Sequence, residues 1–429
     1  MEEKFDVIIV GAGLAGNIAA YLLAKEGLEV IVIERSEAIG AKNVTGGRMY
    51  SHSLEKIIPN FAEEAPVERK ITKERVSFVT ENGSSTIEYA SPDLGEQGKA
   101  TYSILRSRFD PWLAEKAEEE GVMYITGIRV DEVIVDEAGK VCGVRAGEEE
   151  MFADVVLLAD GVNSLLAQQL GMKKELDPSE VAVGIKEVIE LGEEEVSRRF
   201  GVSADEGVAW LFAGDTTGGN ICGGFLYTNK SSVSLGIVTT VGDIGHSDVA
   251  PRDMVERLKN HPVVKPLIEG GDLAEYSAHL VTEGGYNMVP ELYRDGVLVA
   301  GDAAAFVMNL GYTIRGMDLA IESGRLAAET IIEAKNAGDF SKAFLARYEN
   351  KLNESFIMPE LKHYRKFPKI LERHQIFEKY PGMLEEMMKG MFVMYGQPPE
   401  KLMKKMLKPV KKVGLVRVAM DVKDGVGAL

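Results

Sequence analysis

Near the start of the chain, hydrophobic residues first form an unbroken run and then change to a helical spacing. Residues 5–10 read as a parallel strand that is buried on both faces. Residues 18–26 carry apolar positions at the helical repeat, and a second apolar run follows at 29–33. The order strand, helix, strand predicts a βαβ unit and therefore an α/β fold with a parallel sheet.

The turn between the first strand and the helix has the sequence Gly-Ala-Gly-Leu-Ala-Gly over residues 11–16. Gly11 permits a tight turn, Gly13 lets a pyrophosphate approach the backbone, and Gly16 lets the helix pack closely on the strand. Free N–H groups at the helix start favour a phosphate there. Glu34 follows Gly16 by 18 residues, close to the spacing at which an acid binds a ribose hydroxyl. We therefore expect a dinucleotide, FAD or NAD rather than NADP; the alternative is a purely structural turn.

A second glycine turn, Gly-Asp-Ala-Ala at 301–304, follows the apolar run 296–300. We interpret the two turns as two ends of one nucleotide site. The dinucleotide-binding fold would then begin at residue 5, end near residue 320 and contain a long insertion. The sequence pattern changes at about residue 181, where predicted strands begin to alternate with glycine turns, as is typical of a mixed or antiparallel sheet. We predict a nucleotide-binding domain at 1–180 with 290–335, an inserted mixed-sheet domain at 181–290, and a helical, basic, Met-rich region at 336–429.

Composition limits the class of protein. The 429 residues are 45% hydrophobic with a mean hydropathy of −0.05, and no charge-free apolar run is long enough to span a bilayer. The first strand begins too early for a signal peptide, so we expect a cytoplasmic protein. Net charge is −18, but residues 361–429 carry +8, and an acidic body argues against nucleic acid as a partner.

Three segments together resemble the para-hydroxybenzoate-hydroxylase-like flavoproteins: the first glycine turn, Asp160-Gly161 after a strand, and Gly301-Asp302-Ala303. The resemblance implies FAD as the cofactor, with Asp160 and Gly161 beside the pyrophosphate and Asp302 at the ribityl or ribose region. It also implies that Arg106, which opens a helix to residue 120, contacts the FAD phosphates.

Motifs within the insertion, and one that follows the second glycine turn, are similar to those of the electron-transfer-flavoprotein:quinone oxidoreductases, and above all to the Fix-type (FixC-like) subgroup. The motifs are Lys42-Asn43-Val44-Thr45-Gly46-Gly47-Arg48, Gly223-Gly224-Phe225-Leu226-Tyr227, His261-Pro262, Leu267-Ile268-Glu269-Gly270-Gly271, Glu283-Gly284-Gly285-Tyr286 and Arg315-Gly316-Met317-Asp318-Leu319-Ala320. The resemblance covers most of residues 1–335 and implies electron transfer from an electron-transfer flavoprotein through FAD to a quinone.

Larger members of that family carry a four-cysteine iron–sulfur domain, whereas this chain has only Cys142 and Cys222. The Fix-type resemblance therefore implies a complex with the two electron-transfer-flavoprotein subunits and a small ferredoxin-like iron–sulfur subunit. It implies menaquinone or ubiquinone as acceptor and allows electron bifurcation among NADH, ferredoxin and quinone.

The expected FAD-binding residues come from all of these segments. They are Gly11, Gly13, Leu14, Ala15, Gly16, Glu34, Arg35, Lys42, Asn43, Gly46, Gly47, Arg106, Val130, Asp160, Gly161, Gly301, Asp302, Gly311, Arg315 and Gly316. The start of the helix at 317–334 should direct N–H groups at the flavin and favour negative charge on it. Arg315 either adds a full positive charge there or pairs with Asp318.

No acid–base or nucleophile constellation is evident, so no catalytic residue is predicted beyond this tuning role. The six histidines are scattered and match no metal motif, so we interpret them as surface or capping groups. We interpret Cys222 as a small buried residue.

The tail carries methionines at helical spacing from Met383 to Met394, followed by six lysines between residues 401 and 412. One interpretation is a Met face that packs into a core or a subunit contact. The other is a surface that dips into lipid while its lysines meet anionic headgroups, which places the protein peripherally on the inner face of the cytoplasmic membrane.

Three rival functions remain open at the level of sequence. A geranylgeranyl-reductase-like isoprenoid reductase has the same fold, but residues 224–227 lack the Trp of that motif. An FAD monooxygenase would need NAD(P)H and oxygen access, and a non-enzymatic flavoprotein would only support the complex.

Overall fold

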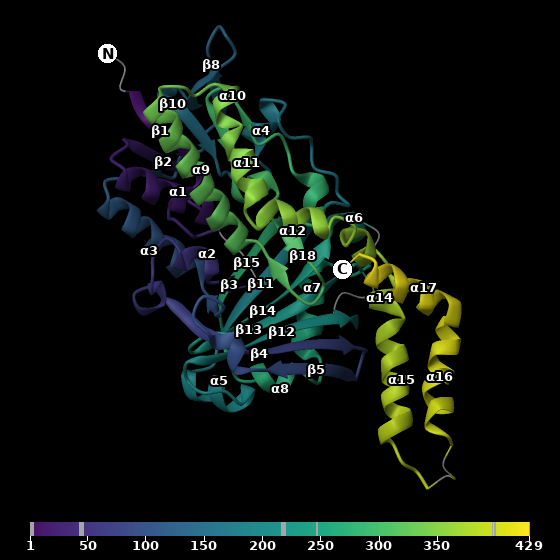
Figure 1. The fold of residues 1–429 in the computed structure, drawn as a ribbon. Coiled ribbons are helices and arrows are strands. Elements are labelled where there is room, and N and C mark those ends of the chain that lie inside the picture. The colour runs from purple at the N-terminus through teal and green to yellow at the C-terminus, as the bar shows by residue number, and fades with distance from the viewer. Residues whose placement is uncertain are drawn as a thin grey trace.

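The computed structural model describes residues 4–42, 47–215, 220–245, 248–396, 398 and 400–428. Two large sheets form the body, and helices pack around them (Figure 1). The buried hydrophobic residues form one large cluster around the first sheet and smaller clusters on the second.

The first sheet has a parallel centre. Its strands are β1 (Lys4–Val10), β2 (Val30–Glu34), β7 (Met123–Thr126), β8 (Glu132–Val135), β9 (Val141–Ala146), β10 (Glu149–Leu158), β16 (Tyr293–Arg294) and β17 (Val297–Val299). The parallel strands lie in the order β17-β10-β1-β2-β7. Val10 lies opposite both Ile33 and Leu158, and Leu158 lies opposite Val299. This register brings the carboxyl ends of four strands to one edge, as the α/β prediction requires.

Three helices cover this sheet: α1 (Leu14–Lys25), α3 (Arg106–Glu119) and α9 (Met317–Ala337). Helix α1 begins at Leu14, earlier than the expected residue 18, because the backbone leaves the turn directly from its cap at Gly13. Helices α1 and α9 touch closely, since a Cβ on Gly324 would lie 2.3 Å from the carbonyl oxygen of Ala15. Only glycine permits that approach.

The second sheet is mostly antiparallel, in the order β15-β11-β14-β13-β12-β4-β6-β3, with β5 on β4. Its strands are β3 (Arg48–Tyr50), β4 (Val67–Val79), β5 (Ser84–Ala90), β6 (Thr101–Ile104), β11 (Val181–Glu190), β12 (Glu206–Gly214), β13 (Cys222–Thr228), β14 (Ser232–Thr240) and β15 (Asp272–Thr282). Strands β3 to β6 precede residue 105 in the chain, yet they belong to the second sheet, because β4 pairs in parallel with β12. The sheets therefore divide the chain differently from the predicted domain limits at 180 and 290.

One face of the second sheet is covered by short helices, whose apolar side chains pack on it. The remaining helices of the body are α2 (His52–Glu55), α4 (Leu165–Gln169), α5 (Glu193–Phe200), α6 (Val241–Ile244), α7 (Pro251–Asn260) and α8 (Lys265–Ile268). Phe200 of α5 and Leu258 of α7 are buried in this layer. The opposite face is left to meet the first sheet.

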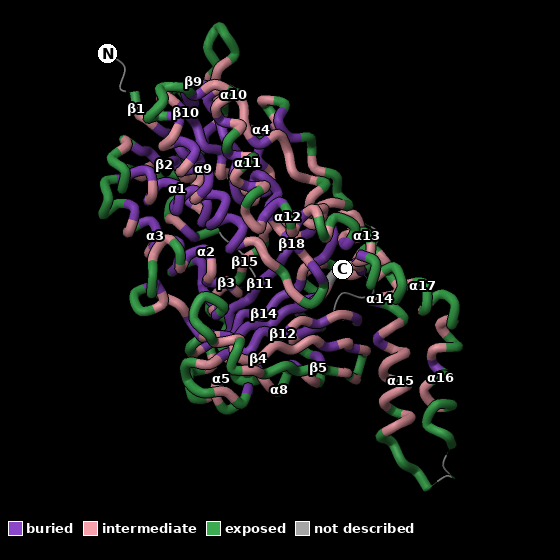
Figure 2. The backbone as a smooth tube through the Cα atoms, viewed as in Figure 1, coloured by how far each residue is buried: buried purple, intermediate pink, exposed green. Residues whose placement is uncertain are grey.

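The last part of the chain is helical, as predicted. Its helices are α10 (Lys342–Leu345), α11 (Arg347–Glu354), α12 (Ile357–His363), α13 (Pro368–Leu371), α14 (Gln375–Glu378), α15 (Tyr380–Phe392), α16 (Leu402–Val413) and α17 (Leu415–Val426). Helices α11 and α12 pack on α9, whereas α15 and α16 lie side by side and extend away from the body (Figure 1). We call α15, α16 and the described residues between them the C-terminal hairpin; its end is exposed (Figure 2).

Candidate functional site: a dinucleotide cavity between two sheets

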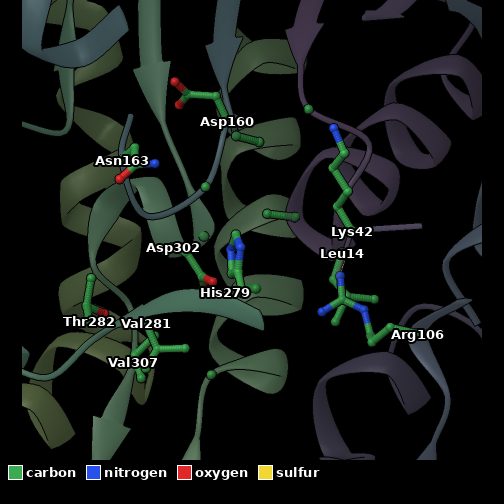
Figure 3. Close-up of a pocket in the computed structure, with 18 of the residues that line it drawn as sticks. Leu14, Lys42, Arg106, Asp160, Asn163, His279, Val281, Thr282, Asp302 and Val307 are labelled. Carbon is green, nitrogen blue, oxygen red and sulfur yellow. The ribbon is translucent and has the colours of Figure 1, made fainter. Parts of the chain in front are cut away.

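A cavity of about 300 Å³ lies where the carboxyl edge of the first sheet meets the second sheet. One wall comes from Gly11, Glu34, Asp160 and Asp302, each of which follows or ends a strand of the first sheet. Figure 3 shows Leu14, Lys42 and Arg106 across the cavity from Asp160, Asn163 and Asp302. A site of this kind, at the carboxyl ends of parallel strands, is where open α/β sheets bind ligands.

The first glycine turn is shaped by contacts that a side chain would prevent. Gly11 has φ +104°, and a Cβ there would lie 2.3 Å from the carbonyl oxygen of Ala159 on the neighbouring strand. A Cβ on Gly16 would lie 2.0 Å from the carbonyl oxygen of Gly11. At Gly13 the space beside the backbone is open, because the nearest atom to a Cβ would be Nη2 of Arg106 at 3.9 Å. The turn thus leaves room for a ligand only where a phosphate is expected.

The start of α1 is suited to an anion. Gly13 caps the helix, and no side chain caps it with a hydrogen bond. Helix N–H groups and the guanidinium of Arg106 therefore face the same space. Arg106 is held in place by buried Asp110, with Nη2 donating to Oδ2 at 2.6 Å.

Glu34 is fixed by two backbone donors at the end of β2. The N–H of Ala12 donates to Oε2 at 3.0 Å, and the N–H of Ser36 donates to Oε1 at 2.8 Å. The carboxylate therefore joins the glycine turn to the second strand and lines the cavity. Its place beside the turn matches the acid that binds a ribose hydroxyl.

Asp160 and Asp302 stand on two loops that are far apart in sequence. Burial raises the pKa of Asp160, although Ser164 donates to its Oδ1 at 2.8 Å and opposes the shift. Burial also raises the pKa of Asp302, while the charges of Arg106, His279 and Lys173 oppose that shift. Two half-buried carboxylates that line a cavity are suited to accept hydrogen bonds from ligand hydroxyls.

Arg315 lines the cavity, but its charge is balanced. Its Nε donates to Asp318 at 2.9 Å, and its Nη1 donates to Glu360 at 2.6 Å. Asp318 is almost fully buried and also binds Nε2 of His52 at 3.1 Å. Burial raises the pKa of Asp318, yet the hydrogen bond from His52 and the charge of Arg315 outweigh it and lower the pKa. The pairing with Asp318 is thus present, and the flavin-tuning role of Arg315 stays a prediction.

Most of the predicted cofactor residues line this one cavity. They are Gly11, Gly13, Leu14, Ala15, Glu34, Arg35, Lys42, Arg106, Val130, Asp160, Gly161, Gly301, Asp302, Arg315 and Gly316. Gly16 instead packs against the turn, Gly47 lies against Tyr227, and a Cβ on Gly311 would lie 3.4 Å from Leu371 of α13. Asn43 and Gly46 lie outside the described residues.

Residues outside the predicted cofactor set also line the cavity, among them Asn163, His279, Val281 and Thr282. Asn163 lies on the Asp160 loop, and His279, Val281 and Thr282 come from β15. His279 was expected to be a surface or capping group; it lies beside Asp302 (Figure 3), and burial lowers its pKa. Strand alternation alone could not identify it, because β15 reaches the cavity only through its pairing with β11.

The cavity fits a dinucleotide with a diphosphate at its centre. The uncapped helix start and Arg106 supply the positive end, and the acids at the strand ends supply acceptors for hydroxyl groups. The side toward the second sheet is apolar, with Phe225 and Val238 facing the same space. FAD has each of these parts: a diphosphate, hydroxyl groups and a flat ring.

Comparisons with known proteins agree with this geometry. Residues 4–354 match the FAD binding domain family, and residues 367–429 match the ETF-QO/FixC family C-terminal domain. The chain is 49% identical to the probable electron transfer flavoprotein-quinone oxidoreductase YdiS of Escherichia coli, over the whole of both chains. The chain belongs to the ETF-QO/FixC family. It is therefore an FAD-dependent oxidoreductase, as the sequence motifs predicted.

Two other relatives extend the comparison. Protein FixC of Salmonella typhi is 50% identical over the whole of both chains, and protein FixC of Azotobacter vinelandii is 44% identical over 90% of this chain and 89% of its own. ETF-QO/FixC relatives thus match the C-terminal hairpin as well as the FAD-binding part.

Among solved structures, a geranylgeranyl bacteriochlorophyll reductase-like protein from Thermoplasma acidophilum has a TM-score of 0.75 and 20% identity, with both chains fully covered. PqsL of Pseudomonas aeruginosa, a probable FAD-dependent monooxygenase, has a TM-score of 0.62 and 18% identity over 87% of this chain and 98% of its own. These likenesses confirm the flavoprotein fold; at such identities they carry no statement about substrate.

Proposed function

We propose that this protein passes electrons from an electron-transfer flavoprotein, through its FAD, to a membrane quinone. The observation that carries the proposal is the composition of the cavity. It joins the dinucleotide wall to an apolar wall of Phe225, Tyr227 and Val238 from the second sheet. That wall suits a flat apolar ring beside the cofactor. The similarity to YdiS, a probable electron transfer flavoprotein-quinone oxidoreductase, supports a quinone as that ring.

The residues around the cavity supply position and charge. FAD held there would exchange electrons one at a time or in pairs, so it would link a one-electron donor to a two-electron quinone. The helix start at Gly316 and Met317 adds N–H groups near the apolar wall. The similarity to Fix-type proteins also supports a separate ferredoxin-like iron–sulfur subunit and a place in an electron-bifurcating complex with NADH and ferredoxin.

The C-terminal hairpin supports a peripheral contact with the inner face of the cytoplasmic membrane. In the part of the chain that the structure describes, no helix is both long and apolar enough to cross a bilayer. At the end of the hairpin, Phe392, Met394 and Tyr395 are each about three-quarters exposed, and Lys401 and Lys404 at the start of α16 are exposed as well. Apolar side chains next to lysines are the pattern that inserts into anionic lipid surfaces.

The methionines divide between the two interpretations of the tail. Met383 to Met391 are half-buried, which agrees with packing, whereas Met394 and Met403 are exposed. The lipid contact is therefore assigned to the end of the hairpin and to the first turn of α16.

A two-step anaerobic experiment tests the relay. The purified holoprotein is mixed with its reduced electron-transfer flavoprotein, and bleaching of the visible absorbance of its oxidised flavin reports the first step. A menaquinone or ubiquinone analogue is then added, and we expect the absorbance to return. NADH and ferredoxin added to the same mixture test bifurcation.

A geranylgeranyl lipid serves as the competing acceptor. If this lipid reoxidises the flavin and neither quinone does, the isoprenoid-reductase alternative holds and the relay is wrong. If neither acceptor reoxidises a flavin that the electron-transfer flavoprotein has reduced, the acceptor part of the proposal is wrong.

A further inference from the structure

Lys173 joins the two loops that carry the half-buried acids of the cavity, Asp160 and Asp302. Its Nζ donates to the carbonyl oxygen of Val162 at 2.7 Å and to that of Ala303 at 3.1 Å. Val162 lies in the loop of Asp160, and Ala303 follows Asp302 directly. One ammonium group therefore connects segments about 140 residues apart in sequence.

The surroundings of Lys173 are unusual for a lysine. The residue is 7% exposed, and lysines are almost never buried unless they are paired. Burial lowers its pKa to about 8, and the negative charges of Asp160 and Asp302 oppose that shift. Arg106 and His279 also act on Asp302 from the opposite wall and from β15, so these five groups form one coupled set.

The loops held by Lys173 have strained backbones that need support. Ser164 has φ +39° and Ala305 has φ +58°, conformations that residues other than glycine rarely adopt. Ser164 closes the first loop by donating to Asp160, and the N–H of Ala305 donates to the carbonyl oxygen of Asp302. Such strain persists only where neighbouring contacts fix the backbone.

We propose that Lys173 is a cofactor-positioning residue: its ammonium group fixes the 160–164 loop against the 301–304 turn and so directs the carboxyl groups of Asp160 and Asp302 toward the hydroxyl groups of FAD. Lys173 acts through these loops and needs no contact with the cofactor. This role is independent of the electron acceptor, since it concerns the affinity of the chain for FAD.

Reconstitution of the apoprotein tests the role. Flavin is removed, FAD is titrated back, and quenching of its fluorescence gives the dissociation constant. We expect Lys173→Met to raise this constant by at least about tenfold, the effect of losing charge-assisted hydrogen bonds. Lys173→Gln keeps an N–H donor without the charge and should fall between Met and wild type.

Lys174→Met is the matched control, because Lys174 is the adjacent lysine and is exposed. Its dissociation constant should equal that of wild type. Circular dichroism of each apoprotein separates loss of fold from loss of affinity. A folded Lys173→Met protein that binds FAD as tightly as wild type would overturn the proposal.

The pH dependence of FAD affinity distinguishes positioning by charge from simple packing. The diphosphate of FAD favours the charged lysine, so binding raises the pKa of Lys173 above its value of about 8 in the free chain. Affinity should then be full below pH 8 and fall as pH rises through the raised pKa. Lys173→Met should lack this slope. If wild-type affinity stays constant from about pH 7 to 10, the window around the lysine pKa, the proposal is wrong, even where no variant folds.

Discussion

The FAD cavity and the C-terminal hairpin differ in where their charged and apolar side chains lie. In the cavity, charged groups are buried and paired, as Arg106 is with Asp110 and Arg315 is with Asp318. In the hairpin, large apolar side chains such as Phe392 and Tyr395 are exposed, and so are Lys401 and Lys404. The cavity thus pairs its charged groups within the chain, whereas the hairpin leaves apolar area for another surface to cover.

This contrast separates two kinds of specificity. A buried charge binds a defined cofactor because its geometry is fixed and its desolvation has already been offset. An exposed apolar tip with lysines selects only a class of surface, such as an anionic bilayer. Changes in the cavity should therefore alter the cofactor and leave the membrane contact intact, and changes in the hairpin should do the reverse.

The largest effect is expected from Gly11→Ala. The new Cβ would meet the carbonyl oxygen of Ala159 at 2.3 Å, and the residue would keep φ +104°. We expect loss of bound FAD and a loss of about 3 kcal/mol of unfolding free energy from overpacking and strain. The ratio of flavin to protein absorbance and a denaturant titration measure these. Gly27→Ala is the control, since it has φ +82° with no atom near its Cβ, and should cost only about 1 kcal/mol.

The second prediction concerns the hairpin. Phe392→Asp combined with Met394→Asp should reduce binding to phosphatidylglycerol vesicles by tenfold or more, because burying each large side chain contributes about 1.5–3 kcal/mol. Vesicle co-sedimentation gives the bound fraction, and FAD content should not change. Ile87→Asp with Tyr89→Asp is the control, because these residues are also exposed but lie on β5. Equal vesicle binding by both double variants would contradict the contact.

A smaller effect is expected from Glu34→Gln. One of the two N–H donors, from Ala12 or Ser36, would then face an amide NH₂ in place of an oxygen. The affinity for FAD should fall about tenfold, which corresponds to ~1.4 kcal/mol for one lost acceptor. Titration of the apoprotein measures it, with exposed Glu26→Gln as control. An unchanged constant would mean that the carboxylate does not bind the ribose.

The smallest effect on the flavin is expected from Arg315→Ala. Because Asp318 and Glu360 balance the guanidinium, the midpoint potential of the flavin should fall by only about 20–30 mV, while unfolding free energy falls by about 3 kcal/mol as Asp318 loses its partner. Spectroelectrochemistry and thermal denaturation measure the two. Arg325→Ala is matched, since Arg325 pairs with Glu322 and Glu329 on the same helix. It should lose stability without a change in potential; equal potentials in both variants would exclude the tuning role.

Local sequence was informative where one segment makes the structure by itself. The glycine turn at 11–16, the buried strands and the acid at Glu34 could be predicted, because steric limits on the backbone and the two-sided burial of a parallel strand act over a few residues. The family motifs likewise identified FAD and the electron-transfer class, which the relatives confirm.

The sequence by itself thus determined the nucleotide fold, its cofactor and its family. Only the tertiary structure decided which distant residues complete the cavity. Lys173 reaches Ala303 across about 130 residues, His279 enters from β15, and strands before residue 105 join the second sheet. The pairing of Arg315 with both Asp318 and Glu360 is of the same kind. These contacts arise from strand register and helix packing over long separations, and no local pattern encodes them.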